Sequence, residues 1–468
     1  MVPQAKDTNG DGFIDGDGGV PARGALSRQP SSRIVGEGNR IAQPHERLIG
    51  GALSWYLSDG GFPVRLDACD SRGNEARWRV TSTAGTVLVT EWRRLTDRRC
   101  ARTVTLPEGR YDLTLEVRTP DARDSETVPL EVRNILIVAL GDSYASGEGN
   151  PRNVRSWLRE GGSFSAYWDD DPCRRSVHAA PAQAALALER ASRESSVTLV
   201  HVACSGATVD AGILGPQTAA GQTSSQVEQA SALMAGREAD LVLLSIGGND
   251  VGFTSVLQAC ALSSDCPVTR PPAGPLAGYP TVQAGVQAQT AALAGDLDRV
   301  AACLGGQACV LADGRTVPAL LLADGAQVMP SLYPDITRAA NGQACSYLTI
   351  PAQDFAWARG TILDPAPAPT YPYPLTRGGT ATLSVAAGSL NGQLGASARL
   401  PGWRPVTGTW SASGAGPVGH GVCAGDESWV FGFTGFSALP SASFHPNPIG
   451  QQVLARQLEV SASALVAP

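Results

Sequence analysis

The feature that most restricts the fold of this chain is a six-residue apolar run, Ile135–Leu140, which ends abruptly at Gly141-Asp142-Ser143. A short, uninterrupted and partly β-branched run is typical of a strand buried on both faces of a parallel sheet. Ser143 then lies just past the carboxyl end of a core strand, where open α/β sheets bind their ligands. It is therefore a candidate nucleophile, which would need a base and an oxyanion hole. The alternative is that Asp142 or Ser143 only caps the next helix.

Two further stretches of sequence favour the interpretation of Ser143 as a nucleophile over that of a helix cap. A second apolar run, Leu241–Ile246, is followed directly by Gly-Gly-Asn-Asp at 247–250. Near the end of the chain, the segment Ser443-Phe-His-Pro-Asn447 precedes a helical pattern at 450–458. Gly-Asp-Ser, Gly-Gly-Asn-Asp and His-Pro-Asn, in this order, resemble the motifs of the SGNH (GDSL-type) serine hydrolases. The resemblance extends from about residue 135 to the end of the chain.

This resemblance implies a fold and a set of site residues. The fold is a three-layer, flavodoxin-like α/β domain with a parallel sheet. Ser143 would be the nucleophile, and its N–H, the N–H of Gly206 and the side-chain amide of Asn249 would form the oxyanion hole. Gly206 follows the apolar run Val197–Ala203, in the block Cys-Ser-Gly. The alternatives are that Gly206 is a simple turn glycine and that Asn249 bonds to its own turn.

The resemblance also selects the base among the five histidines, which are residues 45, 178, 201, 420 and 445. His445 lies in a loop before a helix, as the family requires, whereas the runner-up His420 lacks the Pro-Asn context. The family usually has Asp three residues before this His, but the chain has Ala442 there. We therefore predict a Ser143–His445 dyad in which the Ala442 carbonyl accepts a hydrogen bond from the ring Nδ1–H. A carboxylate elsewhere, such as Asp426, is the alternative orienting group.

At 468 residues the chain exceeds one typical domain. Short stretches of alternating polarity between residues 76 and 132 predict a β-sandwich. Residues 106–117 resemble a strand region of Ig-like or PKD domains. We predict a tail and linker at 1–47, an Ig/PKD-like β-sandwich at 48–133 and the SGNH hydrolase domain at 134–468. Within the last, the pattern predicts helices at 179–192, 225–234, 284–304 and 381–398, and a last parallel strand at 403–406.

The ten cysteines indicate disulfides. Their number is even and they form no Cys-x-x-Cys pairs, which favours disulfides over a metal site. Pairing by proximity along the chain gives 69–100, 173–204, 260–266, 303–309 and 345–423, although the sequence does not fix the connectivity. Disulfides favour a secreted protein, and secreted actinobacterial SGNH esterases, which this chain resembles, carry them in similar places.

A candidate calcium loop lies near the N-terminus. Asp7, Asn9, Asp11 and Asp15 alternate as in EF-hand or dockerin loops. Position twelve of the loop is Gly18, so the usual bidentate acid is missing. The alternative is an acidic tail that binds no metal.

Taken together, these features predict a secreted serine esterase or lipase that cleaves carboxylic esters and requires no cofactor for catalysis. The expected substrates are small-molecule or lipid esters. The alternatives are an acetylesterase acting on acylated polysaccharide, and a non-catalytic cell-surface or carbohydrate-binding protein. A net charge of −7 and a pI of about 5.4 argue against a nucleic-acid partner. No apolar run approaches the roughly 18 residues that a membrane span needs.

Overall fold

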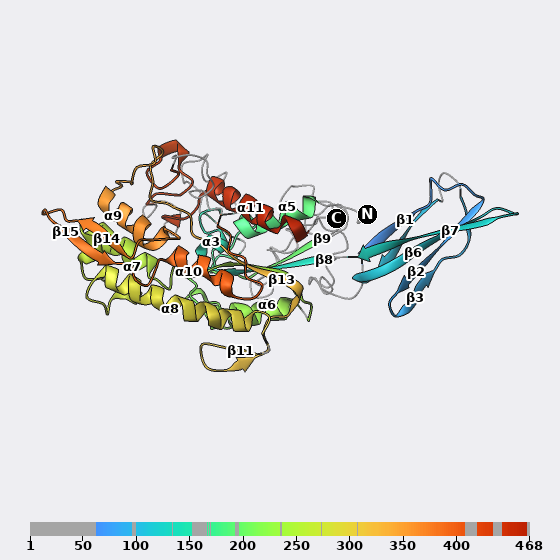
Figure 1. The fold of residues 1–468 in the computed structure, drawn as a ribbon, viewed down its shortest axis with the longest axis horizontal. Coiled ribbons are helices and arrows are strands. Elements are labelled where there is room, and N and C mark those ends of the chain that lie inside the picture. The colour runs from blue at the N-terminus through green and yellow to red at the C-terminus, as the bar shows by residue number, and fades with distance from the viewer. Residues whose placement is uncertain are drawn as a thin grey trace.

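The protein is described here from a computed structural model, which covers residues 62–465 except for 96–99, 133, 152–165, 167, 169, 192–195, 235, 273, 307, 408–418 and 434–441. An antiparallel β region lies at one end of the chain's long axis and an α/β region at the other (Figure 1). The predicted tail 1–47 and its calcium loop lie outside the described residues.

The β region consists of two antiparallel sheets. The larger has the order β3-β2-β6-β7, with β4 paired to β2, and the smaller pairs β1 with β5. The strands are β1 (Phe62–Asp67), β2 (Glu75–Ser82), β3 (Gly85–Val89), β4 (Arg93–Arg94), β5 (Ala101–Leu106), β6 (Gly109–Arg118) and β7 (Arg123–Val132). In β2 the apolar residues Ala76, Trp78 and Val80 are buried, and they pack with Leu66 and Leu106 in a separate core. The predicted all-β region is confirmed, whereas its Ig/PKD-like type stays a prediction.

The α/β region is built on a four-stranded parallel sheet of order β13-β10-β8-β9. Its strands are β8 (Asn134–Gly141), β9 (Ser196–His201), β10 (Ala239–Ser245) and β13 (Leu322–Pro330). All six residues of the apolar run Ile135–Leu140 are 0% exposed, as expected for a strand with neighbours on both sides and helices on both faces. The predicted parallel sheet is confirmed.

Helices cover both faces of this sheet, which gives three layers. The longer ones are α5 (Ala180–Ala191), α6 (Gln226–Met234), α7 (Phe253–Leu262), α8 (Val282–Cys303), α9 (Ala352–Ala358), α10 (Leu390–Ala396) and α11 (Pro448–Ala462). Figure 1 shows α5 and α11 on one side of the sheet and α6 and α8 on the other. The remaining elements are α3 (Ser143–Ser146), two hairpins and several short helical turns. The hairpins are β11–β12 (Cys309–Val310 and Thr316–Val317) and β14–β15 (Thr370–Pro374 and Thr380–Ser384).

Two predicted elements of this region need correction. The segment predicted as a helix at 381–398 begins with β15, and only its later part, Leu390–Ala396, is α-helical. The β-branched alternation of Thr380–Ser384 pairs with β14, which overrides the weak helical pattern. The segment at 403–406 does run parallel to β13, but only through single bridges from Trp403 and Val406, so it does not extend into a regular strand.

All five disulfides predicted by proximity are present: 69–100, 173–204, 260–266, 303–309 and 345–423. The longest-range of these, Cys345–Cys423, spans 78 residues and ties the chain after β13 to the segment before α11. In the described part of the chain, none of the helices has the length and apolar character that a membrane-spanning helix requires.

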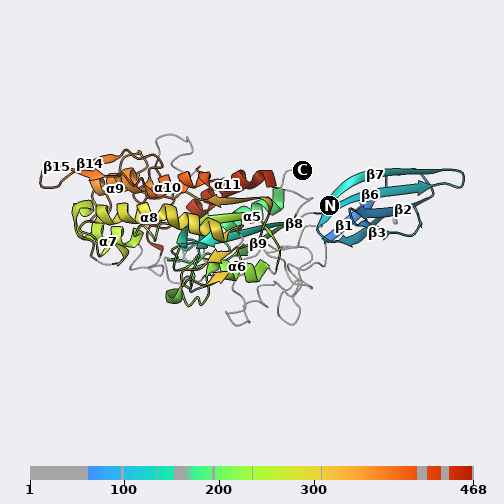
Figure 2. The same cartoon turned by 60° about the horizontal axis from the view of Figure 1, so that its bottom comes forward.

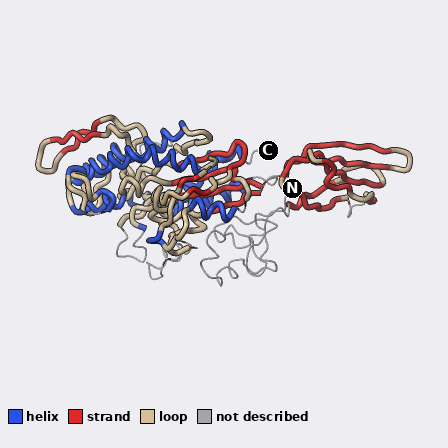
Figure 3. Tube along the Cα trace, turned by 90° about the horizontal axis from the view of Figure 1, so that it is seen from below, coloured by secondary structure: helices blue, strands red, loops and turns tan. Residues whose placement is uncertain are grey.

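Strand β8 connects the β region at its amino end to Ser143 at its carboxyl end. Strand β7 ends at Val132 and β8 begins at Asn134, so the amino end of β8 adjoins the β region. Ser143 follows the opposite end, about 25 Å away for an eight-residue strand. Figures 2 and 3 show the β region and the α/β region apart along the long axis from two other sides. The β region therefore lies at the edge of the parallel sheet that is remote from Ser143.

Candidate active site

Ser143 is the first residue of α3, a single helical turn that directly follows β8. Asp142 is the N-cap of this turn, and its Oδ1 accepts a hydrogen bond from the Tyr144 N–H at 3.0 Å. Capping by Asp142 therefore coexists with a serine at the carboxyl end of a core strand. Ser143 is 7% exposed.

The Asp142 carboxylate is the centre of a buried network. Its Oδ1 also accepts from the Ser245 hydroxyl at 3.1 Å, and its Oδ2 accepts from the Tyr333 hydroxyl. Burial raises the pKa of Asp142 to about 6, and the hydrogen bonds from Tyr333, Tyr144 and Ser245 act in the opposite direction. The Tyr333 oxygen in turn accepts the N–H of Gly248 at 2.9 Å. The network thus links the turn that carries Ser143 to the turn that carries Asn249.

The two predicted oxyanion residues follow the strands on either side of β8. Gly206 comes after β9 and is exposed, with φ of +81°, a conformation that favours glycine. Asn249 comes after β10, and its Nδ2 donates to the Ala207 carbonyl at 2.9 Å. One amide hydrogen of Asn249 is used in this way, which leaves the second for a ligand. Because β9, β8 and β10 are adjacent and parallel, their carboxyl ends meet at one edge of the sheet.

His445 precedes α11, whose N-cap is Asn447. The side chain of Asn447 accepts from the N–H groups of Ile449 and Gly450, each at 3.0 Å. The ring Nδ1 lies 2.9 Å from the Ser443 carbonyl oxygen. A carbonyl oxygen only accepts, so this contact places a proton on Nδ1.

The prediction that the Ala442 carbonyl orients the ring is therefore wrong by one residue. The Ala442 carbonyl accepts the backbone N–H of His445 at 3.0 Å instead. The reason is a tight turn in which Phe444 has a φ of +63°. This turn directs the Ser443 carbonyl toward the imidazole, and the Tyr144 hydroxyl donates to the Phe444 carbonyl at 3.0 Å, which fixes the turn against α3.

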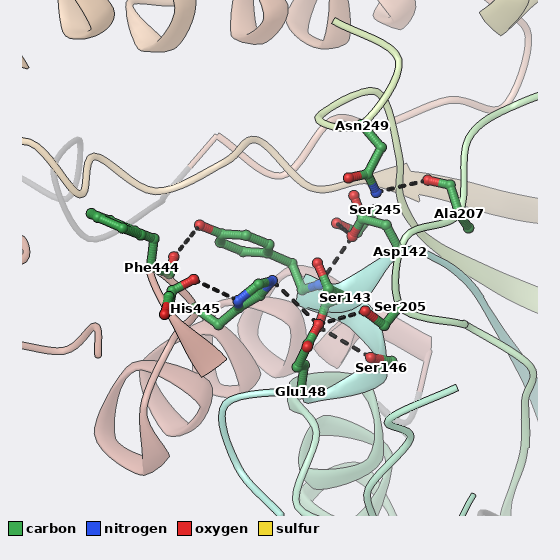
Figure 4. A network of polar contacts seen from close by, with 12 residues as sticks. Asp142, Ser143, Ser146, Glu148, Ser205, Ala207, Ser245, Asn249, Phe444 and His445 are labelled. Carbon is green, nitrogen blue, oxygen red and sulfur yellow. Dashed lines mark hydrogen bonds and ion pairs between the residues drawn. The ribbon is translucent and has the colours of Figure 1, made fainter. Parts of the chain in front are cut away.

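The second ring nitrogen of His445 lies near a carboxylate that the sequence analysis did not identify. His445 Nε2 lies 3.4 Å from Glu148 Oε2. Glu148 is 4% exposed and also accepts a hydrogen bond from the Ser205 hydroxyl (Figure 4). Among the described residues, the ring nitrogens contact Ser443 and Glu148, and the Ser143 hydroxyl is not hydrogen-bonded to the ring. The rings of His445 and Tyr144, the residue after Ser143, have centroids 5.5 Å apart.

The two other candidates for the base site are engaged elsewhere. The ring of His420 stacks on Trp429 with centroids 3.5 Å apart, and its Nδ1 donates to the Glu427 carbonyl at 2.8 Å. Asp426 is exposed in the short turn Gly425–Glu427.

The buried His201 has a structural contact with α3, because its Nε2 donates a hydrogen bond to the Ala145 carbonyl at 3.0 Å. Burial lowers the pKa of His201 to about 3, so its ring stays neutral.

Residues 137–271 match the family GDSL-like Lipase/Acylhydrolase. The matched segment contains Ser143, Gly206 and Asn249, and ends before His445. Lipase 1 of Streptomyces coelicolor is 34% identical over 131 residues, which are 27% of this chain and 35% of that protein. This chain thus spans about a third of the length of the curated relative that it matches.

The solved structures matched by this chain include an extracellular lipase from Streptomyces rimosus and a family two carbohydrate esterase from Clostridium thermocellum in complex with cellohexaose. The first has a TM-score of 0.40 and 22% identity, covering 70% of this chain and 99% of that one. The second has a TM-score of 0.29 and 11% identity, covering 86% of this chain and 89% of that one.

Proposed function

We propose that this protein is a carboxylic ester hydrolase that forms an acyl-enzyme on Ser143 with His445 as the base. The observation that carries the proposal is the convergence of three loops at the carboxyl ends of adjacent parallel strands, next to an imidazole whose Nδ1 is held by the Ser443 carbonyl. A proton fixed on Nδ1 leaves Nε2 as the basic nitrogen. The match of residues 137–271 to a lipase/acylhydrolase family supports the same chemistry.

In the first half of the reaction, Ser143 Oγ attacks the ester carbonyl carbon while His445 Nε2 accepts the hydroxyl proton. The hydrogen bond between these groups would form with substrate bound, since catalytic hydrogen bonds often tighten only at that stage. The tetrahedral oxyanion accepts hydrogen bonds from the N–H groups of Ser143 and Gly206 and from the Asn249 amide. Collapse expels the alkoxide, which takes the proton from Nε2 and leaves as the alcohol.

In the second half, a water molecule attacks the acyl-enzyme with His445 again as the base. The same three donors receive the oxyanion, and the carboxylic acid leaves as the Ser143 hydroxyl is restored. The Ser443 carbonyl acts through both halves by holding the tautomer and the orientation of the ring. A carboxylate orients the imidazole in the familiar triad, but the role is one of orientation and is open to a carbonyl oxygen.

The experiment that tests this proposal is hydrolysis of p-nitrophenyl esters by the wild-type protein and by Ser143→Ala. The wild type should turn over the ester, and the variant should lose at least about a thousandfold in kcat, because removing a member of such a site leaves only the oxyanion hole and binding. Turnover by the variant at the wild-type rate would refute the role of Ser143. Failure of the wild type to hydrolyse any ester, together with no labelling by a fluorophosphonate probe, would favour the non-catalytic alternative.

The substrate class needs a separate measurement. A panel of p-nitrophenyl esters with acyl chains from acetate to palmitate, set beside acetate release from acetylated xylan, separates a general esterase or lipase from a polysaccharide acetylesterase. We favour small-molecule or lipid esters, because the β region lies about 25 Å from Ser143, at the far end of β8. From there it is not placed to present a bound glycan to the nucleophile.

Secretion is part of the proposal and is supported by the five disulfides.

A further inference from the structure

Glu148 is a buried acid with no part in the mechanism just described. It lies five residues after Ser143, in the loop that follows α3, and is 4% exposed. Isolated buried carboxylates are costly, so a buried Glu normally has charged or hydrogen-bonding partners. The partners of this one are the Ser205 hydroxyl and the Nε2 of His445, the latter at 3.4 Å.

The backbone around Glu148 is held tightly against the histidine loop. The Trp168 indole N–H donates to the Glu148 carbonyl at 3.2 Å. A Cβ at Gly149 would lie only 2.2 Å from the carbonyl oxygen of Pro446 and 3.2 Å from the Cβ of His445. The two loops therefore approach to a distance that only glycine permits at this position. This approach brings the backbone of Glu148 close to that of His445, and burial and the hydrogen bond from Ser205 hold the carboxylate near the imidazole.

The two contacts of the His445 ring fit its positively charged form. The Ser443 carbonyl on Nδ1 and the Glu148 carboxylate on Nε2 are both acceptors, and only the imidazolium donates from both nitrogens. A neutral ring with its proton on Nδ1 would turn a lone pair toward the carboxylate. The imidazolium forms when His445 takes the proton from Ser143, so the carboxylate favours the charge that appears in the transition state.

Resting on the function proposed above, we propose that Glu148 is a positioning residue for the base and a counter-charge for its imidazolium form, while the Ser443 carbonyl holds Nδ1. It stabilises the imidazolium of His445 from the Nε2 side, and its second partner, Ser205, ties the base to the oxyanion loop one residue before Gly206. The Nε2 proton stays within reach of the leaving alkoxide, because a carboxylate 3.4 Å away attracts the charge without a short hydrogen bond.

The test compares Glu148→Gln with Glu148→Asp, and uses Asp426→Asn as a matched control that removes an exposed acid of the same region. Gln keeps the size and an acceptor for Ser205 but lacks the charge, whereas Asp keeps the charge. Besides Glu148, the titratable groups that face the ring are Tyr144 and, at longer range, Asp142, and all three variants retain both. The readouts are kcat, KM, the pH profile of kcat/KM and the melting temperature.

We expect kcat of Glu148→Gln to fall by about 10-fold or more, with KM changed less than about twofold. The acid limb of its profile should move to lower pH, because the imidazolium loses its counter-charge. Glu148→Asp should keep the wild-type acid limb, and the control should match the wild type throughout. A wild-type kcat and acid limb in Glu148→Gln would overturn the proposal, as would equal losses in both variants without movement of the acid limb.

These outcomes are separate from those that test the proposed function. Ester hydrolysis that is lost in Ser143→Ala upholds the function whatever the Glu148 variants do. If Glu148→Gln does not fold, the kcat of Glu148→Asp decides. A counter-charge role keeps it near the wild-type value, because the charge is kept, and a loss of about 10-fold or more with the wild-type acid limb would overturn the proposal.

Discussion

The Tyr333 hydroxyl donates to the Asp142 carboxylate and accepts the N–H of Gly248 at 2.9 Å. Asp142 directly precedes Ser143, and Gly248 directly precedes Asn249. One phenol oxygen therefore couples the turn of the candidate nucleophile to the turn of a candidate oxyanion donor. The pair is fully enclosed, since Asp142 is 1% and Tyr333 is 7% exposed.

The variant Tyr333→Phe should lower both stability and catalysis. It leaves a buried carboxylate oxygen and the Gly248 N–H without a partner, a loss of about 1–3 kcal/mol in the free energy of unfolding. We expect kcat to fall by about 10-fold with a smaller effect on KM, because the Asn249 turn loses its support. Urea unfolding and ester kinetics measure the two effects. Tyr371→Phe, in strand β14, is the control, and equal behaviour of the two variants would contradict the coupling.

Because the pKa of Asp142 is raised, part of the free energy of unfolding should depend on pH. Its pKa is about 6 in the folded chain, against an ordinary value of 3.8. The folded state therefore binds more protons between about pH 4 and 6, so the stability that the protonated group confers is complete below pH 3.8 and is lost as pH rises to 6. Two pKa units correspond to about 3 kcal/mol.

Asp142→Asn, a neutral residue of the same size, should lack this pH dependence, so the variant and the wild type should differ by an amount that changes with pH. Its free energy of unfolding relative to the wild type should rise by up to about 3 kcal/mol between pH 4 and pH 7. The comparison is needed because His201, whose pKa is lowered to about 3, acts in the opposite direction over the same range. A difference between variant and wild type that does not change with pH would contradict the prediction. Asp426→Asn, which removes an exposed acid, is the control.

Asn249→Ala should reduce kcat by about 10²–10³, with most of the effect in kcat, because the amide would stabilise charge that develops only in the transition state. Asn249→Asp is the sharper variant. It keeps the size of the side chain but has no N–H, so it loses the hydrogen bonds to both the Ala207 carbonyl and the oxyanion. Wild-type kcat in Asn249→Asp would remove this residue from the oxyanion hole.

The disulfide Cys173–Cys204 should support the oxyanion loop. The Cys173 carbonyl accepts the Ser205 N–H at 2.9 Å, next to Gly206. Replacing both cysteines by Ala opens a loop of 31 residues, which should cost about 3–4 kcal/mol of stability and lower kcat. The matched control removes Cys303–Cys309, which spans six residues near hairpin β11–β12. Thermal unfolding and ester kinetics give the comparison. A kcat loss of the same size in both double variants would contradict a local role.

Some of the site could be predicted from sequence because each of its loops follows a strand or precedes a helix. Ser143, Gly206 and Asn249 come directly after apolar runs, so their place at one edge of the sheet follows from strand polarity. His445 stands before a helix that Asn447 caps. These relations are local, and the hydrophobic pattern shows them.

Glu148 and Tyr333 could not be found in the same way. Glu148 stands in a glycine-rich loop that looks polar, and it is buried in the fold, where Gly149 packs against the distant Pro446. Tyr333 lies 191 residues from its partner Asp142. The identity of the orienting carbonyl depended on one backbone angle, the φ of +63° at Phe444, which no sequence pattern indicated. The only sequence signal for Glu148 was its position, five residues after the candidate nucleophile in a loop that follows a buried strand.

The most direct test of the account is to map the adduct of a fluorophosphonate probe by mass spectrometry in the wild type and in His445→Ala. The wild type should carry one adduct, on the tryptic peptide that contains Ser143, and His445→Ala should be labelled at least about a hundredfold more slowly, since general-base assistance of this kind contributes about 10²–10⁴. Labelling of another serine, or labelling of Ser143 at the same rate without the imidazole, would contradict the central claim that His445 activates Ser143.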